Sequence, residues 1–120
     1  MATILVVDDE ADVLDVIAFA LEDAGYEVAT AHNGRCGLEV MTDARPDLVL
    51  TDFMMPVMSG PEMVRAMRAD GGRDTPVILM SAVPAVALNE NPDFFVAAIQ
   101  KPFRMGEIVK LVGDVIGAPR

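Results

Sequence analysis

The chain has 120 residues, a net charge of −10, 52% hydrophobic residues and 23% charged residues. This length suits one domain with a buried core, and this composition excludes a disordered chain. The excess of acid argues against direct binding of nucleic acid, whose phosphates need cationic partners, and the single cysteine, Cys36, excludes an internal disulfide.

Short apolar runs alternate with helical stripes from the start of the chain to its end. Strands are expected at residues 3–7, 27–31, 48–51, 76–80 and 95–99. Helices are expected from Val13 to a stop at Gly25, at residues 34–44, after Pro61, and over a last stripe that carries Ile108 and Ile116. The segment 82–93 contains Pro84 and Pro92, so it predicts a short helix at residues 85–88 or none.

Repeated strand–helix units predict the α/β class with a parallel sheet and helices on both faces. The expected architecture is a flavodoxin-like, doubly wound sheet of five strands in the order 2-1-3-4-5. Ligands of such sheets bind at the carboxyl ends of the strands, where the winding direction reverses.

Polar side chains follow the apolar runs at that expected edge. Asp8 and Asp9 follow the first strand, Asp52 the third, Ser81 the fourth and Lys101 the fifth. Two carboxylates about 4 Å apart repel by roughly 4 kcal/mol at an effective dielectric constant of about 20. The pattern therefore predicts a balancing positive charge, for which a divalent cation with oxygen ligands is a natural candidate.

Four segments resemble one family, the receiver domain of two-component response regulators. They are VVDDE (6–10), DLVLTDFMMPVMSG (47–60), LMSA (79–82) and QKPF (100–103). The resemblance covers nearly the whole chain, and four motifs in order at strand ends are specific. It implies a single-domain receiver over residues 1–120, with no effector domain.

The resemblance also implies a role for each site residue. Asp52 would be the phosphoacceptor, and Lys101 would pair with Asp52 and then with the phosphoryl group. Ser81 would bind a phosphoryl oxygen. The metal would be Mg²⁺, with Mn²⁺ as the alternative, and its ligands would be Asp8, Asp9, Asp52 and the backbone carbonyl of Met54.

The implied function is a phosphorylation-dependent signalling switch. The phosphoryl donor would be a sensor histidine kinase or a histidine phosphotransfer protein, and output would pass through contacts with a downstream protein. Such a domain is not an enzyme in the ordinary sense, although it would catalyse its own phosphorylation and slow autodephosphorylation. No apolar run reaches the roughly 20 residues of a membrane span, and the N-terminus lacks the basic region of a signal peptide, so a cytoplasmic location without membrane insertion is expected.

The chain departs from the family pattern at two positions. Ala98 stands three residues before the site lysine, where receivers usually carry an aromatic residue, so the read-out of phosphorylation is expected to use another element. Met54, two residues after Asp52, is large and apolar, and it would border the path of a hydrolytic water.

Three alternatives remain open from the residues. A phosphatase of the haloacid dehalogenase type also forms an aspartyl phosphate, but it would need an Asp-x-Asp pattern after the first strand. A flavin- or nucleotide-binding module would need a Gly- or Ser/Thr-rich phosphate loop there, whereas this chain has Asp8-Asp9-Glu10. A receiver-shaped scaffold that is never phosphorylated is the third, and Ala98 keeps it open.

Overall fold

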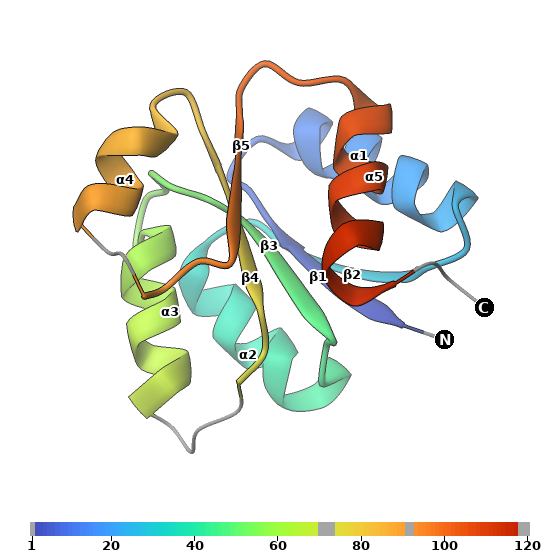
Figure 1. Cartoon of the computed structure of the whole chain (residues 1–120). Helices are drawn as coiled ribbons and strands as arrows, with labels where there is room; N and C mark the ends of the chain where they lie inside the picture. Colours follow the sequence, from blue (N-terminus) through green and yellow to red (C-terminus); the bar gives the residue numbers. More distant parts are fainter. Residues whose placement is uncertain (1, 70–73, 91–92, 118–120) are drawn as a thin grey trace.

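The computed structural model describes residues 2–69, 74–90 and 93–117, in which five strands alternate with five helices (Figure 1). The strands are β1 (Thr3–Val7), β2 (Glu27–Ala31), β3 (Leu48–Asp52), β4 (Val77–Ser81) and β5 (Ala97–Gln100). The helices are α1 (Ala11–Asp23), α2 (Gly34–Ala44), α3 (Gly60–Ala69), α4 (Pro84–Glu90) and α5 (Met105–Ile116). The predicted α/β class is confirmed.

All neighbouring strands pair in parallel, in the order β2-β1-β3-β4-β5, as the sequence predicted. The chain leaves β1 toward β2 and then returns past β1 to β3, so the winding reverses between β1 and β3. The register pairs Val7 with Thr51 across that switch point. Asp8 and Asp52 are the next residues in each chain segment, so the register brings them to adjacent positions at the carboxyl edge.

Both faces of the sheet are covered, which explains why the central strands are apolar without interruption. Ile4 and Val6 of β1 face α1 and α5, whereas Leu5 and Val7 face α2 and α3, and all four side chains are fully buried. Figure 1 shows this division, with α1 and α5 on one side of the sheet and α2 and α3 on the other. Burial of each large aliphatic side chain stabilises the fold by about 1.5–3 kcal/mol.

The predicted bounds of three strands were wrong by one or two residues. β3 extends to Asp52 instead of ending at residue 51, β4 covers Val77–Ser81 instead of 76–80, and β5 begins at Ala97 instead of residue 95. Pairing continues past the apolar run because Phe53 N–H donates to the carbonyl of Met80 at 3.1 Å. Asp52 and Ser81 are therefore the last residues of their strands, and strand geometry sets their backbone.

The segment between β4 and β5 contains the helix that the sequence left undecided. Helix α4 covers Pro84–Glu90 and is longer than the four residues predicted, with Pro84 at its first position, where the missing amide hydrogen costs nothing. Pro92, the second proline of this segment, lies outside the described residues.

Helix α5 begins at Met105 with Arg104 at the capping position, where no Ser, Thr or Asp is present. The Glu107 carboxylate compensates directly, because it accepts the backbone N–H of Arg104 at 3.1 Å. This bond satisfies one of the free amide groups at the helix start. Within the described ranges, no helix has both the length and the apolar character that a membrane crossing requires.

Candidate functional site

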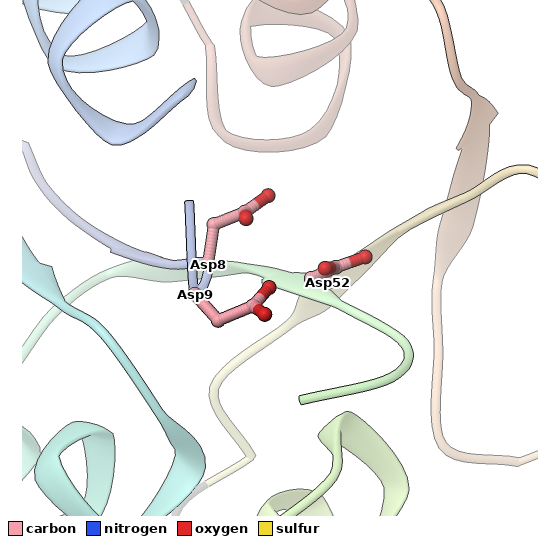
Figure 2. A group of neighbouring side chains, drawn as sticks. All are labelled: Asp8, Asp9 and Asp52. Carbon is pink, nitrogen blue, oxygen red and sulfur yellow. The ribbon is translucent and has the colours of Figure 1, made fainter. Parts of the chain in front are cut away.

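Three carboxylates converge at the carboxyl edge of the sheet (Figure 2). Asp8 and Asp9 follow β1, and Asp52 ends the neighbouring strand β3. One oxygen from each of the three lies within 4.8 Å of the others. The strand order therefore brings together the acids that the sequence placed at separate strand ends.

The two adjacent acids differ in their surroundings. The Asp8 side chain is fully buried, and its Oδ1 accepts the Glu10 N–H at 3.0 Å, which holds the carboxylate against the start of α1. Asp9 is exposed. Asp8 is thus the fixed member of the pair, and Asp9 is the member that solvent reaches.

Lys101 supplies the positive charge that the acid pair requires. Its Nζ lies 2.8 Å from Asp8 Oδ2 and 3.3 Å from Asp52 Oδ1. The sequence predicted Asp52 as the partner of this lysine, and the structure adds Asp8 as the closer one. The lysine comes from the loop after β5, at the opposite end of the sheet order from β2, so the ion pair spans β1, β3 and β5.

Asp52 is nearly buried, and its pKa is raised from the ordinary value of 3.8 to about 6, first by burial and second by the negative charge of Asp8. Lys101 and the backbone N–H of Phe53, which donates to Asp52 Oδ1 at 2.9 Å, act in the lowering direction. A carboxyl with this pKa is mostly ionised at neutral pH and can act as a nucleophile there.

The pKa of Lys101 lies above its ordinary value. Burial lowers this pKa, but the hydrogen bond to Asp8 and the charges of Asp52 and Asp8 together outweigh the burial. The ammonium is therefore charged throughout the physiological range. It is suited to hold anionic oxygen atoms and unsuited to act as a base.

Ser81 ends β4 at the same edge and is almost fully buried. Its Oγ accepts the Val83 N–H at 3.0 Å, so the hydroxyl is tied to its own loop. A hydroxyl in this arrangement still has a hydrogen to donate toward an anion near Asp52.

The predicted ligand Met54 lies in the loop between β3 and α3, with 69% of its surface exposed. The role of its carbonyl stays a prediction. Ala98 lies on β5 and packs against the side of the core that α2 and α3 cover, paired in register with Leu79. Two aromatic residues, Phe94 and Phe95, precede Ala98 in the chain. Their rings form an edge-to-face pair with centroids 6.3 Å apart.

The three acids fit a hard divalent cation. Oxygen ligands around Mg²⁺ at 2.0–2.1 Å lie about 3 Å apart when adjacent and about 4 Å apart when opposite. Separations within 4.8 Å come close to these values, and small side-chain rotations would close the difference. Carboxylate oxygens are also the donor type that this ion prefers.

Two residues beside Asp52 were missed by the sequence analysis. Thr51 is fully buried and donates its hydroxyl to the Asp52 carbonyl at 3.0 Å, and Gly60 packs against that same carbonyl. A polar residue at the end of an otherwise apolar strand was the available signal for Thr51. No local signal marks Gly60, because its role depends on where α3 returns to β3.

The sheet order and the edge cluster define a flavodoxin-like receiver fold, and comparisons with known proteins agree. A profile of the response regulator receiver domain matches residues 4–113. The chain therefore belongs to the response regulator receiver family.

Relatives and solved structures give the same result. The chain is 46% identical to the phosphate regulon transcriptional regulatory protein PhoB of Pseudomonas aeruginosa over 81 residues, which cover 67% of this chain and 35% of that protein. It is 34% identical to the DNA-binding response regulator MtrA of Mycobacterium tuberculosis over 114 residues, which cover 91% of this chain and 48% of that protein. The chemotaxis response regulator CheY4 of Vibrio cholerae superposes with a TM-score of 0.89 at 33% identity, over 97% of this chain and 99% of that one.

The chain thus spans less than half the length of these two curated relatives. Receiver domains of response regulators act as phosphorylation-dependent switches in two-component systems, and response regulators interact with histidine kinases. Family membership favours this function over the phosphatase and flavin-module alternatives.

Proposed function

We propose that Asp52 accepts a phosphoryl group from a phosphohistidine of a sensor histidine kinase or a histidine phosphotransfer protein, in the presence of Mg²⁺. The observation that carries this proposal is the position of Lys101 Nζ, 3.3 Å from Asp52 Oδ1, beside a cluster of three carboxylates. A nearly buried carboxylate with one ammonium and two further acids around it suits transfer of an anionic group.

The transfer balances without any further reactant. An Asp52 oxygen forms the new bond to phosphorus, while the bond from phosphorus to the donor imidazole nitrogen breaks and the imidazole leaves with the electron pair. Lys101 would turn toward the phosphoryl oxygens and stabilise the charge that spreads over them. The resulting acyl phosphate would later be hydrolysed slowly, and exposed Met54 would border the path of the attacking water.

Asp8, Asp9, Asp52 and the carbonyl of Met54 would hold the metal ion. When bound, Mg²⁺ supplies positive charge that offsets the repulsion between the carboxylates and the incoming phosphoryl oxygens. Exposed Asp9 would adjust to the ion most easily, whereas Asp8 is already held by Lys101 and the Glu10 N–H.

Ser81 would pass the change to the surface. Its hydroxyl would bond a phosphoryl oxygen and draw the loop between β4 and α4 toward Asp52. Val83 and Val86, which belong to this loop and to α4, are 55% and 50% exposed. A shift of this apolar surface would alter contacts with a downstream protein, which is how the domain would signal.

A groove of about 580 Å³ beside Lys101 supports a protein as the phosphoryl donor. Its lining comes from the start of α1, from the residue after β4 and from the segment between β5 and the start of α5. The lining residues are Glu10, Asp12, Val13, Val16, Ala82, Lys101, Pro102, Phe103 and Met105. Apolar side chains near acidic ones form a surface to which a helix with apolar and basic residues would bind.

The direct test is incubation with acetyl phosphate and Mg²⁺, followed by intact mass. The expected result is a gain of one phosphoryl group that is absent in Asp52→Asn and in samples with EDTA. Label transfer from candidate phosphorylated kinases then identifies the donor. A gain that persists in Asp52→Asn would contradict the assignment, and no gain from any donor would favour the scaffold alternative.

A further inference from the structure

Thr51 carries a buried hydroxyl that takes no direct part in the proposed phosphotransfer. It lies between Leu50 and Asp52 on β3, and all of its surface is buried. Valine has the same shape, suits a buried strand better and has no polar group to satisfy. The hydroxyl therefore needs an explanation other than packing.

The hydroxyl has a specific partner, the carbonyl oxygen of Asp52, at 3.0 Å. That carbonyl belongs to the peptide unit that joins Asp52 to Phe53. The N–H of the same unit donates to Asp52 Oδ1 at 2.9 Å and to the Met80 carbonyl at 3.1 Å. One peptide unit thus links the Thr51 hydroxyl to the acceptor carboxylate, through the oxygen that lies 3.3 Å from Lys101.

Gly60 closes the other side of this peptide unit. Its N–H donates to the Phe53 carbonyl at 2.9 Å, and a Cβ at this position would lie only 2.4 Å from the Asp52 carbonyl oxygen. Any side chain at residue 60 would therefore displace α3 or the peptide. The Asp52–Phe53 peptide is held by a hydrogen bond on one side and by close backbone packing on the other.

We infer that Thr51 is a positioning residue for the phosphoacceptor: its hydroxyl fixes the plane of the Asp52–Phe53 peptide, whose N–H in turn fixes the Asp52 carboxylate. This inference rests on the proposed function. A donor on the carbonyl also polarises the peptide and strengthens its N–H as a donor. Without the hydroxyl, the plane would rotate more freely, and the carboxylate would spend less time aligned for attack on phosphorus.

The test compares two pairs of proteins. Within each pair, the only polar group at residue 51 that differs is the side-chain hydroxyl, which one member has and the other lacks. The first pair is the native Thr51 and Thr51→Val, and the second is Thr51→Ser and Thr51→Ala, which share the loss of the methyl group. Thr75→Val is the matched control, because Thr75 is also buried but precedes β4 at the opposite end of the sheet. Each protein is incubated with acetyl phosphate and saturating Mg²⁺, and the rate of phosphorylation is measured by intact mass.

Loss of one neutral hydrogen bond of about 1 kcal/mol corresponds to roughly fivefold, and a misaligned nucleophile costs more, so the hydroxyl-free member of each pair is expected to react about 5- to 30-fold more slowly. Thr75→Val should react at the native rate. In metal-free samples the ¹³C signal of the Asp52 carbonyl should move upfield in Thr51→Val and Thr51→Ala and stay near its native position in Thr51→Ser. If Thr51 acted only through the packing of its methyl group, serine would not restore the signal, because serine has the hydroxyl but lacks the methyl group.

The outcomes separate the two proposals. Suppose that the native protein is phosphorylated. The positioning role is then overturned if the two phosphorylation rates agree within twofold in both pairs, or if the ¹³C chemical shift of the Asp52 carbonyl is the same with and without the hydroxyl. If the native protein accepts no phosphoryl group, the proposed function fails, and the carbonyl signal alone then decides whether Thr51 holds the peptide. Should Thr51→Val fold poorly, the serine and alanine pair gives the same comparison.

Discussion

The ammonium of Lys101 lies 2.8 Å from a carboxylate oxygen of Asp8, a residue 93 positions earlier in the chain. Asp8 is fully buried, and 22% of the lysine side chain is exposed. An ion pair with one buried member is costly to break from one side, because the remaining charge keeps its desolvation penalty without compensation. This pair therefore links the stability of the fold to the chemistry of the site.

Lys101→Met is expected to lower the free energy of unfolding by about 1–3 kcal/mol in metal-free buffer at pH 7.5, because it leaves buried Asp8 without its cation. Added Mg²⁺ should restore part of the loss by supplying positive charge at the same place. Urea unfolding with and without MgCl₂ measures both effects. Lys110→Met is the control, since Lys110 is the other lysine and lies exposed on α5. Equal losses in the two variants would contradict a specific role for Lys101.

Asp52 should make the metal-free protein less stable as pH rises. Its pKa is raised from 3.8 to about 6, so the folded state holds a proton that the unfolded state has released between these values. Stability from this group is therefore present below pH 4 and is lost as pH rises through about 6. Asp52→Asn should unfold at a higher denaturant concentration than the native protein at pH 7.5, with a smaller difference at pH 4.5. A difference that is constant with pH would show that Asp52 does not titrate in this range.

Asp8 and Asp9 should separate metal binding from stability. Asp9→Asn changes an exposed side chain, so it should alter unfolding by no more than about 0.5 kcal/mol. It should nevertheless weaken Mg²⁺ binding at least about tenfold, since even outer-shell partners of metals contribute about 10- to 100-fold. Asp8→Asn should weaken binding and also lower stability, because Lys101 loses its closest partner. Calorimetric titration with Mg²⁺ and urea unfolding give the two quantities. Equal effects of the two variants on the free energy of unfolding would contradict the different roles assigned to Asp8 and Asp9.

Gly60 and Gly106 offer a matched comparison of close backbone packing. Gly60→Ala places a Cβ 2.4 Å from the Asp52 carbonyl oxygen and should cost about 2 kcal/mol or more in stability. Gly106→Ala on α5 meets nothing within 4 Å and should stabilise the protein by up to about 1 kcal/mol, through better helix propensity and a less flexible unfolded chain. Thermal unfolding of the two variants measures the contrast. A neutral Gly60→Ala would mean that α3 moves easily against β3.

Much of the fold followed from local pattern. Uninterrupted apolar runs such as Ile4–Val7 predict strands covered on both faces, and the stripe from Ile108 to Ile116 predicts an amphipathic helix. The strand ends were less accurate, because an apolar run reports burial, whereas a strand ends where backbone pairing ends. Phe95 illustrates the difference, since its side chain is buried but β5 begins two residues later.

The sequence by itself determined which residue types meet at the carboxyl edge, because each polar residue directly follows an apolar run and parallel strands end at one edge. Only the tertiary structure decided which atoms pair there. That Lys101 lies closer to Asp8 than to Asp52, that Asp8 is buried while its neighbour Asp9 is exposed, and that Gly60 packs on the Asp52 carbonyl all depend on the return of distant segments to β1 and β3. Local pattern carries no information about such approaches, since differences of half an ångström between partners come from the packing of the whole sheet and its helices.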